Sequence, residues 1–340
     1  MPTDTNQSQI AGVTVTTDVS ISRIGWALLW IGSVASVLLL ILRFVWFDGW
    51  WLLAVTNYYR PVAFAPCVVV VPLALWRGRK SLAAVALPGA IWCLLTLLSF
   101  VPSKAPVAVG ESLRVVTANL LQENDEPSAL LRELRALDAD VLILQEVSAA
   151  WNARLRSHGF FRDYPHHVVE VGDYYGIALL SRVPTIETSI RWIRPPDTHA
   201  PMGNPCAFAR IAHEGRAIDI LGVHPSPPFN VRAAAAHLMQ LGAIENWVRE
   251  SDGPLVAAGD FNASEWSRFS TVLSDRMDDA WDLARSGWGP TWPNGRSWLP
   301  GIRLDHIYIS KELTATRVFR GRGRGTDHRP VIADLAWRAE

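Results

Sequence analysis

The stretch "PLVAAGDFNAS", residues 254–264, decides the fold of this chain. Small and branched apolar residues run up to Gly259, and the polar residues Asp260 and Asn262 follow directly. The apolar run is typical of a buried β-strand. A buried Asp or Asn costs free energy unless it is paired. The pattern therefore predicts a strand that ends at a polar site, with an ordinary Asx-turn as the simpler alternative.

Further polar islands stand at the ends of other expected strands, in runs such as "VLILQEV" and "IDILGVHPSPP". They are Thr117-Ala118-Asn119, Gln145-Glu146, His224, Leu304-Asp305-His306 and Thr326-Asp327-His328. Together with 259–262 they supply hard oxygen ligands for a divalent cation and His/Asp pairs for proton transfer. This combination indicates the hydrolysis of a phosphate ester.

The islands resemble the signature of the endonuclease/exonuclease/phosphatase superfamily, which is DNase I-like. The resemblance covers about residues 114–335, and "GDFN" after an apolar strand together with "DHRP" before a final strand carries most of it. It implies a four-layer α/β sandwich, in which two facing β-sheets are flanked by helices. Between the islands, leucines at helical spacing predict a helix over 128–137, and an Ala-rich segment predicts another over 230–250.

The resemblance also implies a metal site for Mg²⁺ or Mn²⁺. Glu146 is expected as the main ligand, with Asn119 beside it and Asp327 as a further contact. A Mg²⁺ ion typically uses one or two protein carboxylates and keeps other positions for water and phosphate. The simpler alternative for Glu146 is a surface carboxylate at a strand end.

Catalytic roles follow from the same resemblance. Asp260 is expected to orient or deprotonate the attacking water, and Asn262 and His224 are expected to bind phosphate oxygens. Asp305 would fix the tautomer of His328, which would lie near the phosphorus atom. Arg182, which follows an expected strand, is a candidate substrate contact; the alternative is an exposed surface arginine.

Composition bounds the class of protein. The chain has 340 residues, no formal net charge, 49% hydrophobic residues and 16 Trp. A neutral chain lacks the overall basic field that is typical of nucleic-acid-binding proteins. Its three Cys show neither a disulfide framework nor the spacing of a structural zinc site.

The apolar residues are concentrated near the N-terminus. After a polar tail over 1–22, uncharged stretches predict membrane spans at about 24–45 and 81–102. A middle span at about 54–76 requires a partner or snorkelling for Arg60. We therefore expect a bundle of about three transmembrane helices, a linker over 104–111 and a catalytic domain over 112–340. A signal peptide and a buried helical hairpin are the disfavoured alternatives.

Orientation follows from the turn Arg77-Gly78-Arg79-Lys80, because short positively charged loops tend to stay in the cytoplasm. The chain is then a multi-pass protein of the cell (inner) membrane, and its catalytic domain lies on the extracytoplasmic side.

The sequence thus predicts a membrane-anchored, divalent-metal-dependent phosphoesterase. Its partners would be the bilayer and a phosphodiester or phosphomonoester, such as a lipid head group. An extracytoplasmic endo- or exonuclease is the alternative, although the neutral charge does not favour nucleic acid. A non-catalytic membrane receptor or scaffold on the same fold is a third possibility, but such a protein would be free to lose Glu146, Asp260 or His328.

Overall fold

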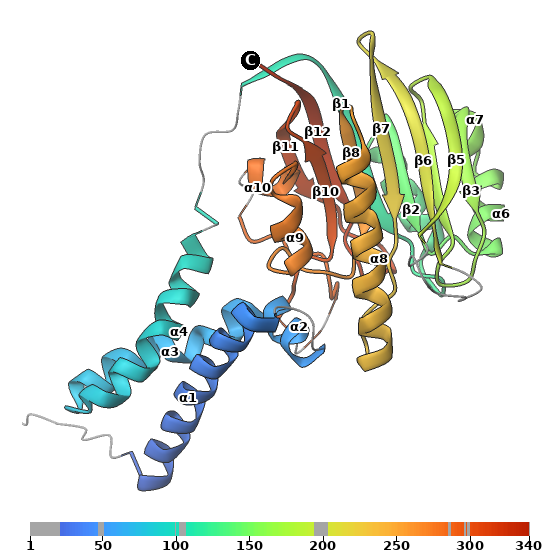
Figure 1. Cartoon of the computed structure of the whole chain (residues 1–340). Coiled ribbons are helices and arrows are strands. Elements are labelled where there is room, and N and C mark those ends of the chain that lie inside the picture. Colours follow the sequence, from blue (N-terminus) through green and yellow to red (C-terminus); the bar gives the residue numbers. More distant parts are fainter. Residues whose placement is uncertain are drawn as a thin grey trace, which may run out of the picture.

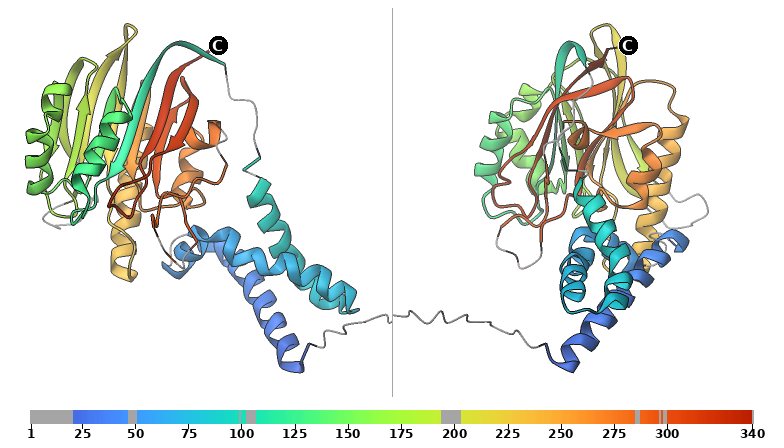
Figure 2. Two further views of the ribbon diagram at one scale, coloured as in Figure 1. Left: turned by 180° about the vertical axis from the view of Figure 1, so that it is seen from behind. Right: turned by 90° about the vertical axis from the view of Figure 1, so that its left-hand side faces the viewer.

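The structure, a computed structural model, describes residues 21–46, 51–98, 100–101, 107–193, 203–284, 287–295, 297 and 300–339. The first four helices are α1 (Arg23–Trp46), α2 (Trp51–Tyr58), α3 (Arg60–Trp76) and α4 (Lys80–Leu98). The others are α5 (Pro127–Ala136), α6 (Ala149–Ser157), α7 (Phe160–Asp163), α8 (Val231–Glu250), α9 (Arg268–Leu273) and α10 (Ala280–Ala284). Figures 1 and 2 show α1, α3 and α4 extending away from a β-sandwich, whereas α2 lies against the edge of the sandwich.

Two six-stranded sheets form the sandwich. The first has the order β11-β12-β1-β2-β4-β3, and the second has the order β5-β6-β7-β8-β10-β9. The strands of the first sheet are β1 (Ala108–Asn119), β2 (Val141–Gln145), β3 (His166–Glu170), β4 (Ile177–Ser181), β11 (Leu313–Arg320) and β12 (Val331–Arg338). Those of the second are β5 (Thr185–Ile193), β6 (Asn204–His213), β7 (Arg216–Val223), β8 (Leu255–Asp260), β9 (Met277–Asp279) and β10 (Asp305–Ser310). Both sheets are mixed, because β1 pairs with β2 and β7 with β8 in parallel.

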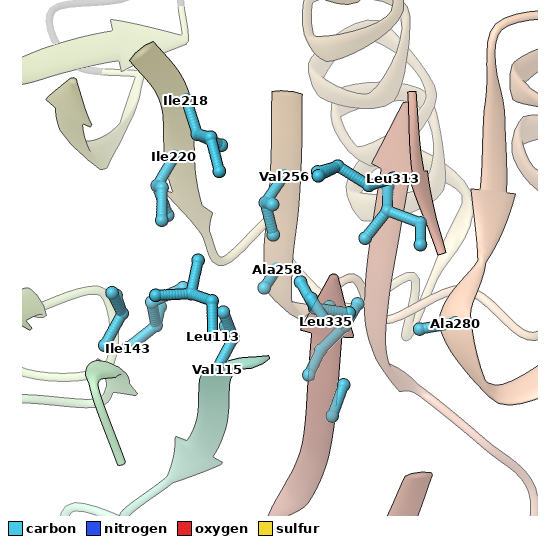
Figure 3. Packing of buried hydrophobic residues seen from close by; sticks show 14 of the residues in the cluster. Leu113, Val115, Ile143, Ile218, Ile220, Val256, Ala258, Ala280, Leu313 and Leu335 are labelled. Carbon is cyan, nitrogen blue, oxygen red and sulfur yellow. The ribbon is translucent and has the colours of Figure 1, made fainter. Parts of the chain in front are cut away.

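The main core lies between the sheets. Val115 and Ile143 of the first sheet and Ile220 and Val256 of the second belong to one buried cluster, and each is fully buried. Figure 3 shows these side chains approaching one another from the two sheets. Successive residues of a strand point to opposite faces. The neighbour Val116 therefore belongs to a second cluster on the outer face of its sheet.

Helices cover both outer faces. On the first sheet, the outer cluster includes Leu130, Leu131 and Leu134 of α5 and Trp151 of α6. On the second, α8 and α9 contribute the residues Leu241, Ile244, Val248, Phe269 and Leu273. The side chain of Asn230 caps α8 by accepting a hydrogen bond from the backbone N–H of Ala233 at 3.0 Å. The layers are thus helix, sheet, sheet and helix, which confirms the predicted four-layer α/β sandwich.

Two predicted boundaries need comment. β1 begins at Ala108, and Val109 already pairs with Trp337, so the second half of the predicted 104–111 linker is strand. The expected domain start at 112 is therefore four residues late. The rest of that linker up to 106, and the predicted polar tail apart from 21–22, lie outside the described residues.

In the described part of the chain, two helices are long and apolar enough to cross a membrane, namely α1 and α4. The predicted middle span over 54–76 is not one straight helix, because the chain bends by 71° between α2 and α3. The break falls at Tyr59, just before Arg60 and Pro61. Proline at the first positions of a helix is favourable, since its missing N–H would have no intrahelical partner there. The sequence "YYRP" therefore ends one helix and starts the next.

Candidate active site

The polar islands meet at one edge of the sandwich. In the parallel pairs, Asn119 lies opposite Gln145, and Val223 lies opposite Gly259. The carboxyl ends of parallel neighbours meet at the same sheet edge. Antiparallel β10 begins where β8 ends, so Asp305 lies opposite Asp260. Strand pairing thus brings these residues to one edge within each sheet, and the packing of the two sheets against each other brings the two edges together.

His328 is held by Asp305. Its Nδ1 lies 2.8 Å from Oδ2 of Asp305, which is completely buried. Since a carboxylate can only accept, Nδ1 donates, and Nε2 is directed to the opposite side, 3.6 Å from Oδ2 of Asp260. Burial alone would lower the pKa of His328, but the carboxylates of Asp305 and Asp260 outweigh burial and raise the pKa to about 10. The ring is therefore a cationic donor at neutral pH.

Asp260 is the centre of the site. Its Oδ1 accepts from the backbone N–H of Asn262 at 2.9 Å, and its Oδ2 accepts from Nδ2 of Asn119 at 3.1 Å. Nε2 of His224 lies 3.6 Å from the same Oδ2 atom. Burial raises the pKa of Asp260 and lowers the pKa of His224. A carboxylate with a raised pKa is a stronger base than an exposed one.

Glu146 lies beside this centre. Its Oε1 accepts from Nδ2 of Asn119 at 3.0 Å, and its Oε2 accepts from the backbone N–H of Gln122 at 2.8 Å. Glu146 and Asn262 have φ values of 60° and 49°, in the left-handed region that side chains other than glycine seldom adopt. Such backbone conformations persist where the surrounding structure fixes them, and they are common at functional sites.

Asp327 approaches from the loop before β12. Its Oδ2 accepts from Nε1 of Trp292 at 3.0 Å. The hydroxyl of the preceding Thr326 donates to the backbone carbonyl of Asn119 at 3.0 Å. The last island is thereby fastened to the end of β1, and Asp327 lines the same cavity as Glu146.

The cavity at this edge has a volume of about 550 Å³. Its polar lining residues are Asn119, Glu146, His224, Asp260, Asn262, Asp327 and His328. None of the described residues that line it is Lys or Arg. The carboxylates of Glu146 and Asp260 both accept from the side-chain amide of Asn119, and the carboxylate of Asp327 lines the same cavity. A divalent cation fits such a donor set, because hard oxygen ligands and uncompensated negative charge favour it.

A group of possible metal ligands also appears among Asp260, Asp305 and His328, whose ligand atoms lie within 4.8 Å of one another. Here Asp305 is engaged by His328, and a protonated imidazole cannot bind a metal ion. We therefore interpret Asp260, Asp305 and His328 as residues that transfer protons, and not as a complete set of metal ligands.

Eight of the nine predicted site residues thus converge at this edge of the sandwich, and Arg182 does not. Arg182 follows β4, which runs antiparallel to β2, so it lies at the end of the sheet opposite Glu146. There it binds Asp138 at 2.5 Å and lies over the ring of Tyr164. Its expected role as a substrate contact is contradicted by this position, and the surface alternative is correct.

Several lining residues were not predicted from the sequence. Val55, Tyr58 and Tyr59 come from α2 and the turn that follows it, and Trp292 and Phe229 come from loops. The break "YYRP" at 58–61 was the available signal for the first three, because Pro and Arg inside an expected span argue against a continuous helix.

Known proteins share this fold and these motifs. A UPF0294 protein of Vibrio parahaemolyticus is 23% identical over 241 residues, which cover 70% of this chain and 82% of that protein. The crystal structure of an endonuclease/exonuclease/phosphatase from Beutenbergia cavernae matches with a TM-score of 0.56 at 19% identity, over 68% of this chain and 72% of that chain. D. rerio TDP2 complexed with a single-strand DNA product matches with a TM-score of 0.55 at 20% identity, over 66% of this chain and 99% of that chain.

A sequence profile of the Endonuclease/Exonuclease/phosphatase family matches residues 116–328, from β1 to the last polar island. Members of that family are generally hydrolases that act on phosphodiester bonds. The chain therefore belongs to the endonuclease/exonuclease/phosphatase family.

Proposed function

We propose that this protein is a membrane-anchored, divalent-metal-dependent phosphoesterase. Its substrate would be a phosphodiester or phosphomonoester, such as a lipid head group. One observation carries the proposal: a buried Asp305–His328 pair, the carboxylate of Asp260 and the carboxylate of Glu146 all face one cavity that no described Lys or Arg lines. An anionic substrate entering such a cavity needs added positive charge.

Glu146, Asn119 and Asp327 would hold Mg²⁺ or Mn²⁺. The bound ion would supply the positive charge that stabilises the phosphate and its leaving oxygen. These residues offer oxygen donors and no thiolate, and hard cations prefer oxygen donors.

The remaining residues have separate roles in an in-line attack by water. Asp260 takes a proton from the attacking water, since burial makes this carboxylate more basic. His328 donates from Nε2 to a phosphate oxygen, and Asp305 keeps the ring in the required orientation. Nδ2 of Asn262 donates one hydrogen to the carbonyl of Pro225 at 3.0 Å and retains the other for phosphate. Neutral His224 donates a further hydrogen bond.

An extracytoplasmic location in the cell (inner) membrane belongs to the same proposal. The guanidinium of Arg79 lies 4.1 Å from the ring centroid of Trp26, near the start of α1. The basic turn and the beginning of α1 are thus close together, far from the sandwich in Figure 1. This supports a topology with both on the cytoplasmic side and the catalytic domain outside.

Two alternatives are less well supported. A nuclease requires contacts to a polyanionic backbone, usually from Lys and Arg, and no described residue lining the cavity is of either type. A receptor or scaffold has no need for an Asp305–His328 pair aimed at Asp260.

The test uses the full-length protein in detergent and four substrates: bis(4-nitrophenyl) phosphate, 4-nitrophenyl phosphate, sphingomyelin and DNA. We expect hydrolysis of an ester with Mg²⁺ or Mn²⁺ and none with chelator or after Asp260→Asn. Cleavage of DNA alone would favour the nuclease, and no metal-dependent hydrolysis of any substrate would overturn the proposal.

A further inference from the structure

Helix α2 packs against the catalytic domain. Ala54 and Tyr58 are buried in the same apolar cluster as Leu241 of α8 and Phe208 of β6. Figures 1 and 2 show α2 against the edge of the sandwich, at the end where the catalytic strands finish. A helix of 8 residues is also too short to cross a bilayer, which requires about 20 apolar residues.

Polar contacts fasten α2 on both sides. The hydroxyl of Tyr58 lies 3.2 Å from Nε2 of His237, whose Nδ1 lies 2.8 Å from the carbonyl of Ser226. Nδ1 therefore donates to the carbonyl, and Nε2 accepts from the tyrosine. At the start of α3, Nη2 of Arg60 donates to the carbonyl of Trp266 at 2.6 Å. Buried hydrogen bonds of this kind specify one position for the helix.

This docking brings α2 into the active-site cavity. Val55, Tyr58 and Tyr59 line the same cavity as Asp260 and His328. Further apolar lining comes from the loop before α8, namely Pro227, Pro228 and Phe229. Phe229 is 80% exposed, so its ring is accessible to a ligand in the cavity.

We infer that α2 is a wall of the substrate pocket and that the substrate is a phosphate ester with an apolar chain, delivered from the bilayer. The inference rests on the proposed function and adds to it the surface that binds the apolar chain of the substrate. The phosphate faces the catalytic residues, and the chain lies between Val55, Tyr59 and Phe229. Immediately after Tyr59 the polypeptide enters α3, so the apolar wall continues directly into the helices α1, α3 and α4, whose surfaces carry exposed apolar side chains.

The competing occupant is a nucleic-acid base, which could stack on the exposed rings of Tyr174, Tyr175 or Phe229. Base stacking in proteins that bind single strands is accompanied by a positively charged groove for the backbone. The described lining of this cavity has no Lys or Arg, which favours a single phosphate with an apolar chain.

The experiment uses the full-length protein in phospholipid nanodiscs with Mg²⁺. The probes are alkyl 4-nitrophenyl phosphates from methyl to octyl, each below its critical micelle concentration. We expect kcat/KM to rise at least tenfold from methyl to octyl. Longer chains also partition into the nanodisc, which raises kcat/KM by itself. The deciding quantity is therefore the ratio of kcat/KM for the octyl ester to kcat/KM for the methyl ester, compared between the wild type and a variant of α2.

Val55→Asp places a charge in the apolar wall, and we expect it to lower that ratio at least tenfold. Ile186→Asp is the matched control: its side chain is an exposed aliphatic on β5, outside the cavity, and its ratio should equal that of the wild type. A hexadecyl ester should be cleaved when it shares vesicles with the enzyme and not when it is confined to separate vesicles.

The outcomes separate the two proposals. Three outcomes would overturn the inference and leave the phosphoesterase intact: metal-dependent cleavage of all esters with a flat chain-length profile, an unchanged ratio in Val55→Asp, or equal cleavage in separate vesicles. The chain-length profile is measured on the wild type. The inference can therefore still be contradicted if the Val55→Asp protein does not fold. No metal-dependent cleavage of any ester would remove both proposals.

Discussion

Oδ2 of Asp305 accepts a hydrogen bond from Nδ1 of His328 at 2.8 Å, and this contact fixes which nitrogen of the ring faces the cavity. Asp305→Asn removes the acceptor charge and allows the wrong tautomer. We expect kcat on a chromogenic diester to fall by about 10²- to 10⁴-fold. The carboxylate also raises the pKa of His328, so in the variant the loss of activity at high pH should begin at a lower pH.

Asp278→Asn is the control for this change, because Asp278 pairs with Lys311 at 2.6 Å outside the cavity. Its kcat and pH profile should match the wild type. An Asp305→Asn protein with a wild-type pH profile would show that the pair has no part in the reaction.

Glu146→Gln tests the metal site. The amide keeps the shape of the side chain but removes the anionic ligand, so the Mg²⁺ concentration for half-maximal activity should rise at least tenfold. Glu187→Gln, on the surface of β5, should leave that concentration unchanged. Melting temperature gives an independent measure of metal binding: Mg²⁺ should raise it in the wild type and leave it unchanged in Glu146→Gln. Full activity of the wild type in chelator would contradict the assignment.

His237 predicts a pH-dependent stability. Burial lowers its pKa to about 4, below the unfolded value near 6.5. Between these values the unfolded state binds more protons, so stability is complete above pH 6.5 and decreases as the pH falls. By pH 4 the loss from this residue amounts to about 3 kcal/mol.

The measurement is the difference in melting temperature between pH 7 and pH 4.5 for wild type and His237→Gln in detergent. Other histidines titrate in both proteins, so the comparison isolates His237. The wild type should lose more stability than the variant, and equal losses would refute the argument.

Gly259→Ala should unfold or strongly destabilise the domain. Gly259 has φ of 155°, and a Cβ there would overlap the backbone carbonyl of Val223 on the neighbouring strand. The expected loss is about 3 kcal/mol, from backbone strain and overpacking together. Gly253→Ala is the matched control, since a Cβ there meets nothing within 4 Å. Thermal denaturation of both variants gives the comparison.

Topology can be tested with reporters fused after the last residue. Three positive charges in the turn over 77–80 resist translocation, so the turn should be cytoplasmic and the C-terminus outside. A reporter active only outside should work, and one active only in the cytoplasm should be silent. The reverse pattern would place the catalytic domain in the cytoplasm and the substrate among inner-leaflet lipids or soluble esters.

Much of the site could be predicted from sequence because strand pairing does the assembly. Asn119, Glu146 and Asp260 each follow an apolar run. Parallel pairing aligns such ends within each sheet, and the face-to-face packing of the two sheets then brings the two edges together. The chain direction of β4 was not readable in the same way. Arg182 also follows an apolar run, but its strand is antiparallel to β2, and its side chain therefore lies at the opposite end.

The role of α2 could not be read from hydropathy. A helix that packs its apolar face on a sandwich and one that faces lipid both consist of apolar residues, and only the contacts distinguish them. Aromatic residues at the end of an apolar segment, such as Tyr58 and Tyr59, are also common at a membrane interface. The partner of Tyr58 is His237, which lies 179 positions away in the sequence and has no recognisable motif.

The docking of α2 also bears on how this protein would diverge among its relatives. Residues of a passive tether can drift freely as long as they remain apolar. Tyr58 and Tyr59 are instead under two demands, because they pack against the sandwich and also line the cavity. If α2 forms a wall of the substrate pocket, exchange of residues 23–98 between relatives should transfer substrate preference, and a chain that begins at Val107 would lose that wall.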